Sequence, residues 1–149
     1  MKKILLSVLL VASVIFANAQ LASPVLWSFT SKKIADKTYE VYLTATIQNS
    51  WHLYSQNVPE DGPIPTSFTY FENSDVKLIG KTIEPESIRE YDENFEGELN
   101  FFKENATFKQ KMKVSTSTSV KGVITYMTCN DTMCLPPKDV EFVITINKL

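Results

Sequence analysis

Apolar and polar residues alternate along most of this chain with a period of two, which is typical of strands that bury one face. The clearest example is segment 39–47, where apolar side chains occupy the odd positions and mostly polar ones the even positions. Segment 107–114 alternates in the same way and places three lysines on the side that is expected to face water. The other candidate strands are segments 25–29, 67–71, 76–79, 123–129 and 140–146.

Two of these segments carry further predictions. In segment 123–129 we expect one continuous strand with Val123, Thr125, Met127 and Cys129 on one side. Segment 85–99 is acidic and lacks the apolar stripe of an amphipathic helix, so we interpret it as a long loop. Seven or eight short strands in one domain-sized chain predict an all-β fold, an antiparallel β-sandwich, rather than an α/β fold.

The first 19 residues have the pattern of a secretory signal peptide. Two early lysines precede an apolar stretch over residues 4–16, and the triplet Ala-Asn-Ala at 17–19 fits a small-x-small cleavage site. The apolar stretch is shorter than the roughly 20 residues that a membrane-spanning helix needs. We therefore expect cleavage after Ala19, one domain over residues 20–149 without membrane insertion, and a location in a bacterial periplasm.

The charge of the mature chain argues against a nucleic-acid partner. The formal charge of the full sequence is −2, and it becomes −4 once Lys2 and Lys3 are removed with the signal peptide. No cluster of basic residues remains that could follow a phosphate backbone. We therefore expect no nucleic-acid binding.

The chain has two cysteines, Cys129 and Cys134, in a C-x4-C arrangement between two predicted strands. An exported protein meets an oxidising compartment, so the pair is expected to form a disulfide and is the first candidate for chemistry. A bridge that closes such a short loop restrains the unfolded chain by roughly 2 kcal/mol, about half the effect of a bridge between distant strands. The spacing is compatible with both a structural bridge and a reversible one.

Metal binding is an alternative use of the same segment. Met127, Cys129, Met133 and Cys134 are soft sulfur ligands suited to Cu(I), and His52 is the one histidine of the sequence. Their spacing matches no defined site, Met127 fits a core position, and a structural zinc site would lack a fourth ligand. We expect no metal and no other cofactor.

Three segments resemble the family of DsbD amino-terminal domains, over most of residues 26–146. They are the cysteine segment 126–137 with its double proline, the segment Trp-His-Leu-Tyr-Ser at 51–55, and the segment Asp-Glu-Asn-Phe-Glu-Gly at 92–97. The resemblance implies an immunoglobulin-like sandwich whose cysteine pair exchanges disulfides with thioredoxin-like partners that carry C-x-x-C. It also implies that the loop with Phe95 covers the sulfurs as a cap.

The same resemblance places five residues around the sulfurs as cap and surroundings: His52, Tyr54, Glu93, Asn94 and Phe95. An aromatic ring over the disulfide would keep small thiols away, and carboxylates nearby would disfavour a thiolate. The alternatives are ordinary, because Phe95 could anchor a loop and Tyr54 could be a core aromatic with its hydroxyl at the rim.

The functional hypothesis is a thiol–disulfide interchange module that passes reducing equivalents between thioredoxin-like proteins. By analogy with the family, Cys134 forms the mixed disulfide, and the chain then acts as a protein thiol–disulfide oxidoreductase. No second membrane span and no C-x-x-C follow in the sequence, so electrons are expected from separate partners, such as a membrane electron carrier. The alternatives are a protein-binding sandwich with a structural disulfide and a Cu(I) carrier.

Overall fold

The computed structural model describes residues 23–147, and the expected signal peptide with its cleavage site lies outside them. Within this range the chain forms strands and no helix, hence none that could span a bilayer. The strands are β1 (Val25–Ala35), β2 (Thr38–Ile47), β3 (His52–Tyr54), β4 (Ser67–Tyr70), β5 (Val76–Ile83), β6 (Ile88–Asp92), β7 (Gly97–Phe102), β8 (Asn105–Val114), β9 (Thr118–Tyr126), β10 (Thr128–Cys129) and β11 (Lys138–Ile146).

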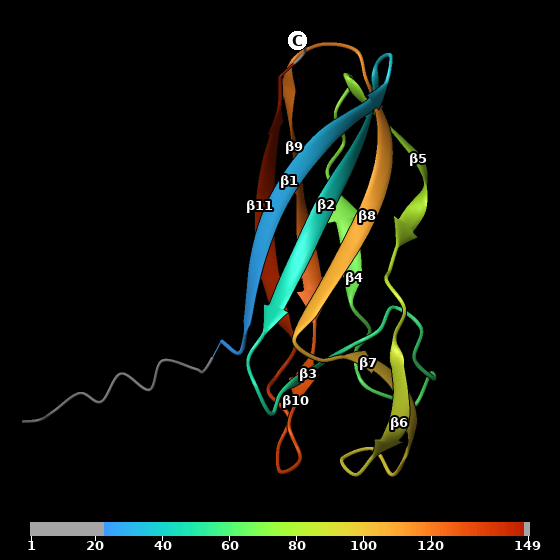
Figure 1. The fold of residues 1–149 in the computed structure, drawn as a ribbon, viewed down its shortest axis with the longest axis vertical. Coiled ribbons are helices and arrows are strands. Elements are labelled where there is room, and N and C mark those ends of the chain that lie inside the picture. Colours follow the sequence, from blue (N-terminus) through green and yellow to red (C-terminus); the bar gives the residue numbers. More distant parts are fainter. Residues whose placement is uncertain (1–22, 148–149) are drawn as a thin grey trace, which may run out of the picture.

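Two antiparallel sheets face each other and form the body of the domain (Figure 1). The first sheet has the order β1-β2-β8-β5, and the second has the order β11-β9-β4. A third sheet with the order β10-β3-β7-β6 extends the molecule at one end, drawn at the bottom of Figure 1. We call the first two sheets the sandwich body and the third the end sheet. The predicted antiparallel β-sandwich is confirmed.

The core of the body follows from the alternation in the sequence. The odd positions of β2 from Tyr39 to Ile47 are buried, and so are the even positions of β8 from Ala106 to Val114. The lysines of β8 face outward as predicted, and Lys109 lies 5.8 Å from the ring centroid of Tyr42. Aromatic rings fill the space between the sheets: Phe108 lies 4.9 Å from Phe68 and 5.9 Å from Trp27, measured between centroids.

The prediction of one strand over residues 123–129 was wrong. β9 ends at Tyr126, and Cys129 belongs to β10, which pairs with β3 in the end sheet. The inward side of β9 is also the opposite one, formed by Val120, Gly122, Ile124 and Tyr126. At Gly122 the neighbouring strands approach closely, since a Cβ there would collide with the carbonyl oxygen of Thr69 and the ring of Phe142.

The prediction of a loop over residues 85–99 was also wrong. This segment forms β6 and the start of β7, which pair from Ile88↔Phe101 to Asp92↔Gly97. Four of the five residues of β6 are exposed, so this edge strand has no alternating pattern to recognise. Its structure comes from pairing with β7, whose Leu99 and Phe101 are buried. The resulting β6–β7 hairpin lies at the same end of the molecule as β10 (Figure 1).

Candidate functional site

The two cysteines form a disulfide at the end of the domain that carries the end sheet. Cys129 pairs with His52 across β10 and β3, and Cys134 faces Cys129 in an isolated antiparallel bridge. The Cα atoms of the two cysteines are 4.0 Å apart. The connection is therefore a small hairpin, as predicted, and we call residues 129–134 the cysteine hairpin.

Local sequence explains why the cysteine hairpin closes. The side-chain oxygen Oδ1 of Asn130 accepts hydrogen bonds from the backbone N–H groups of Thr132 and Met133, both at 2.9 Å. Asparagine commonly organises a turn in this way. After the hairpin, the N–H of Leu135 donates to the carbonyl of Thr128 at 2.9 Å. Two prolines follow, which lack an N–H, so regular pairing stops there until β11 begins.

The two sulfurs differ in accessibility. Cys129 is 0 % exposed, whereas Cys134 is half-buried. Both belong to an apolar cluster at this end of the domain, formed by the buried Tyr54, Leu99, Phe101 and Cys129 and the partly buried Val58, Phe95, Met127 and Cys134. We call it the sulfur cluster. A molecule approaching from solvent therefore reaches the sulfur of Cys134 first.

The turn of the β6–β7 hairpin, residues 93–96, supplies the aromatic lid of the sulfur cluster, and we call it the cap turn. Phe95 packs into the cluster, and its ring meets that of Tyr54 edge-on at a centroid distance of 5.7 Å. The side-chain Nδ2 of Asn94 donates to the carbonyl of Asn130 at 3.0 Å. This hydrogen bond joins the cap turn directly to the cysteine hairpin.

Asp92 fastens the cap turn to β3. Its Oδ2 accepts a hydrogen bond of 2.7 Å from the Tyr54 hydroxyl and lies 3.1 Å from Nε2 of His52. Its Oδ1 accepts from the backbone N–H groups of Asn94, at 2.8 Å, and Phe95, at 3.3 Å. The carboxylate is 4 % exposed. One buried side chain thus connects the strand beside Cys129 with the backbone that carries Phe95.

The electrostatics of this group follow from burial and these hydrogen bonds. Burial by itself raises the pKa of Asp92, but the hydrogen bonds from Tyr54, Asn94 and Phe95 and the nearby His52 outweigh it, so the pKa is lowered. Burial lowers the pKa of His52, although the Asp92 carboxylate opposes this effect. Burial and the hydrogen bond to Asp92 raise the pKa of Tyr54. The group therefore favours a charged Asp92 beside a neutral His52 and a neutral Tyr54.

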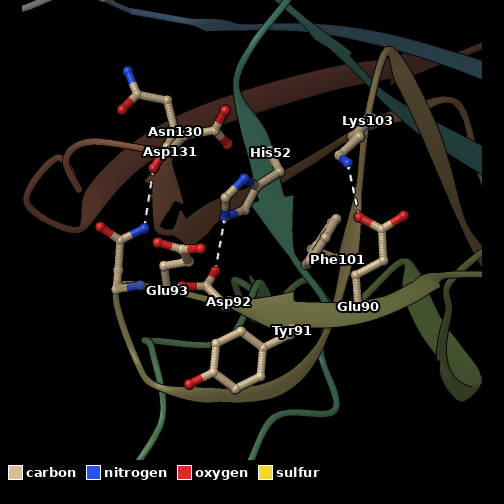
Figure 2. Close-up of a pocket in the computed structure, with 10 residues that line it drawn as sticks. His52, Glu90, Tyr91, Asp92, Glu93, Phe101, Lys103, Asn130 and Asp131 are labelled. Atoms are coloured by element: carbon tan, nitrogen blue, oxygen red, sulfur yellow. Dashed lines mark hydrogen bonds and ion pairs between the residues drawn. The ribbon is translucent and has the colours of Figure 1, made fainter.

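A cleft of about 310 Å³ separates the β6–β7 hairpin from the cysteine hairpin. Figure 2 shows His52 and Asp92 turned toward each other, with Asn130 and Asp131 on the opposite wall. Glu93 and Asp131 line this cleft, while Glu90 pairs with Lys103 at 3.0 Å. The hollow beside the cap turn is therefore mainly acidic.

The residues predicted from the sequence meet at one place. Cys129, Cys134, Tyr54 and Phe95 share the sulfur cluster. His52 lies within hydrogen-bond distance of Tyr54 in this cluster, Asn94 donates to Asn130 next to Cys129, and Glu93 lines the adjoining cleft. Sequence reasoning missed the connecting role of Asp92 and the turn made by Asn130. A sequence signal for both existed: an Asp or Asn at the start of a short turn often accepts hydrogen bonds from backbone N–H groups two or three residues later.

The sulfur atoms proposed for copper are arranged differently. Met127 packs against the sulfur cluster, Met133 is half-exposed in the cysteine hairpin, and the two cysteine sulfurs are bonded to each other. Among residues 23–147, no group of three or more His, Cys, Asp or Glu side chains is positioned to hold a metal ion.

The fold and the site together define a class of domain: a β-sandwich with a disulfide at one end that is covered by an aromatic side chain. The family model described as the N-terminal domain of the thiol:disulfide interchange protein DsbD matches residues 19–145, and the chain belongs to this family. The resemblance expected from the cysteine segment is thereby confirmed. The family takes its description from thiol–disulfide interchange, and the chain carries a cysteine pair that forms a disulfide. Among curated protein sequences, none matches the chain significantly.

Several solved structures resemble this one, including the following two. The reduced N-terminal domain of DsbD from Neisseria meningitidis is 19% identical, with a TM-score of 0.57, over 84% of this chain and 87% of that one. The N-terminal periplasmic domain of ScsB from Proteus mirabilis is 15% identical, with a TM-score of 0.63, over 82% of this chain and 46% of that one. At these identities the likeness concerns the fold, which is the expected immunoglobulin-like antiparallel sandwich.

Proposed function

We propose that this domain is a periplasmic thiol–disulfide interchange module that passes reducing equivalents between thioredoxin-like proteins through Cys129 and Cys134. The observation that carries the proposal is the asymmetric disulfide under an aromatic lid, with one sulfur fully buried and the other half-buried. Thiol–disulfide exchange needs access to one sulfur only, while the other serves as leaving group. The domain would then be an enzyme, a protein thiol–disulfide oxidoreductase.

The proposed exchange proceeds in balanced steps. A donor thiolate attacks Sγ of Cys134, the bond to Cys129 breaks, and Cys129 leaves as a thiolate that takes up a proton. The second donor thiolate then attacks the donor sulfur of the mixed disulfide and releases Cys134. The donor ends as a disulfide, and the cysteine pair has gained two electrons and two protons. With an oxidised client the same steps run in reverse, and Cys134 attacks first.

The cap supports this proposal because it restrains the reaction without blocking it permanently. Phe95 lies in the sulfur cluster, so a protein partner must move the cap turn to reach Cys134. The turn is attached by a few hydrogen bonds to Asp92 and Asn130 and by one ring contact to Tyr54. Each contribution is modest: a neutral hydrogen bond contributes about 1 kcal/mol, and one to a charged carboxylate such as Asp92 about 1.5 to 3 kcal/mol.

The location and the source of electrons belong to the same proposal. The signal-peptide pattern at residues 1–19 supports export, and the ScsB neighbour is a periplasmic domain by its own description. Electrons would come from separate partners, thioredoxin-like proteins with C-x-x-C or a membrane electron carrier. A merely structural role for the bridge has less support, because such a short loop gives only about 2 kcal/mol to a domain that already has an apolar core.

Trapping of a mixed disulfide tests the proposal. A Cys129→Ser variant leaves the accessible Cys134 as a single thiol, and its matched control Cys134→Ser leaves the buried Cys129. Each variant is mixed with a thioredoxin-like protein in which the second cysteine of C-x-x-C is replaced by serine and the first is activated as a mixed disulfide with thionitrobenzoate. We expect a covalent complex on a non-reducing gel for Cys129→Ser and little or none for Cys134→Ser. The absence of any complex with Cys129→Ser would contradict the proposal.

A further inference from the structure

An apolar notch of about 150 Å³ begins immediately after the accessible cysteine. Its walls include three consecutive residues after Cys134, together with parts of β9, β10 and the start of the described chain: Leu135, Pro136, Pro137, Tyr126, Thr128 and Pro24. The notch differs from the acidic cleft, which is lined by Asn130 and Asp131 on the Cys129 side of the cysteine hairpin. Of these two hollows, the notch directly follows the sulfur that a partner would attack.

The chemistry of the notch suits an apolar side chain. A cavity of this size with apolar walls holds a group as large as benzene. Pro136 and Pro137 have no N–H, and the N–H of Leu135 is already bonded to Thr128, so covering these residues leaves none of their donors unpaired. Proline also fixes the walls in advance, which reduces the ordering cost of binding.

Tyr126 closes the inner side of the notch. It is 2 % exposed, and its ring lies 5.7 Å from that of Trp27, measured between centroids. Tyr126 belongs to the core of the sandwich body, so the inner wall of the notch is already fixed before a partner arrives.

We propose that this notch receives an apolar side chain of the thioredoxin-like partner, from a residue next to the partner's reactive cysteine. The inference rests on the proposed function, because only a partner bonded to Cys134 brings the residue beside its own cysteine within reach of Leu135 and the two prolines. The notch would then select partners by the residue beside their cysteine, while the sulfur chemistry itself is common to all of them. A filled pocket at the centre of an interface is the usual form of such an anchor.

Short cysteine peptides test the notch without knowledge of the natural partner. The probes are blocked dipeptides with Leu, Phe or Ser beside Cys, and the readout is the rate at which each reduces the Cys129–Cys134 disulfide of the wild-type domain. Two peptide thiols form one peptide disulfide as the pair is reduced, and each rate is divided by that of the same peptide with oxidised glutathione. We expect the Leu and Phe peptides to be about tenfold faster than the Ser peptide. Equal normalised rates in the wild type would overturn the inference.

Two variants locate the preference. Leu135→Ala removes one wall of the notch and should abolish the advantage of the Leu and Phe peptides, while the rate with dithiothreitol stays within about twofold. The matched control is Leu78→Ala on β5, a 40 % exposed leucine of the sandwich body, which should retain the preference. A preference that persists in Leu135→Ala would overturn the assignment to the notch.

The inference and the proposed function can fail separately. If Cys129→Ser traps the thioredoxin-like protein but the peptides show no preference, the notch is not a partner site and the exchange function stands. If the peptides show the preference but no protein is trapped, the exchange function fails and the notch remains an apolar site beside a disulfide.

Discussion

The sandwich body and the end that carries the cysteines are held together in different ways. The body encloses a large cluster of apolar side chains from both sheets, and Gln110 is its one buried polar residue among residues 23–147. The sulfur cluster has four fully buried members, and around it lie the other buried polar residues of the described chain: His52, Ser55, Thr66, Asp92 and Thr128. The body therefore depends on burial, which is lost only on unfolding, whereas the end depends on individual bonds that can open locally.

The largest expected effect concerns the body. Phe108→Ala removes a fully buried ring that contacts Trp27, Phe68 and Phe102, and it should lower the free energy of unfolding by about 3 to 5 kcal/mol. Denaturant unfolding measures this change. The control is Phe71→Ala, because the Phe71 side chain is 50 % exposed. Well below the melting temperature, the rate of reaction with glutathione should stay unchanged. A faster rate there would mean that body and end are not independent.

Asp92→Ala should affect both regions. It removes the carboxylate that holds the cap turn and leaves His52 and Tyr54 without their buried partner, so we expect a loss of about 3 kcal/mol in the free energy of unfolding. Because the cap turn is released as well, the disulfide should react faster with glutathione. The control Asp61→Ala lies in an exposed loop and should change neither quantity. If the variant is destabilised but reacts with glutathione at the wild-type rate, Asp92 does not hold the cap turn over the disulfide.

Phe95→Ala should act mainly on the end. The ring contact with Tyr54 contributes about 0.5 to 1.5 kcal/mol, so its loss should speed reduction of the disulfide by glutathione about two- to tenfold. Stopped-flow or quenched-flow kinetics with free glutathione measure the rate. Tyr91→Ala, which removes a 62 % exposed ring from β6 of the same hairpin, is the matched control. Equal rates for wild type and Phe95→Ala would show that this ring is no lid.

Acidification should weaken the end through His52. Burial lowers the pKa of His52 below its ordinary value of 6.5, so the unfolded chain binds the proton more readily. The contribution of the neutral ring is present above pH 6.5 and is lost as the pH falls through the lowered pKa. The melting temperature should drop by about 2 to 4 °C more in the wild type than in His52→Gln, which keeps a donor to Asp92 but does not titrate. If the melting temperatures of the wild type and His52→Gln change in parallel with pH, His52 does not have this role.

The smallest expected effect concerns the tie between the two hairpins. Asn94→Ala removes one exposed hydrogen bond to the carbonyl of Asn130, which should speed reduction by glutathione about twofold and leave the melting temperature nearly unchanged. Ser31→Ala, at an exposed position of β1 in the sandwich body, provides the comparison. A large fall in melting temperature would indicate that Asn94 supports the fold rather than the cap.

The body could be predicted from the sequence because its strands are buried on one face. β2, β8 and β11 show clean alternation, and the structure buries the expected sides of all three. The inward side of β9 was predicted wrongly because Gly122 occupies a core position, and a glycine adds no apolar side chain to the pattern. Apolar residues also occupy the other side of this segment, at Val123 and Met127, so the alternation alone did not show which side faces inward.

The site could be predicted only in part, because its parts lie far apart in the sequence. The cysteine spacing and the family resemblance indicated the disulfide and its aromatic lid. The bonds from Asp92 to His52 and Tyr54 span 40 and 38 positions and depend on β6, an exposed edge strand without a recognisable pattern. The difference in burial between Cys129 and Cys134 likewise arises from packing against β3, which no local pattern encodes.

The reduction potential of the Cys129–Cys134 disulfide tests the central claim most directly. It is measured by equilibrating the wild-type domain with defined ratios of reduced and oxidised dithiothreitol or glutathione and counting free thiols. The account predicts a potential above about −300 mV, within reach of thioredoxin-like donors. A potential below this value, in the range of structural disulfides, together with no reduction by a thioredoxin-like protein, would contradict it.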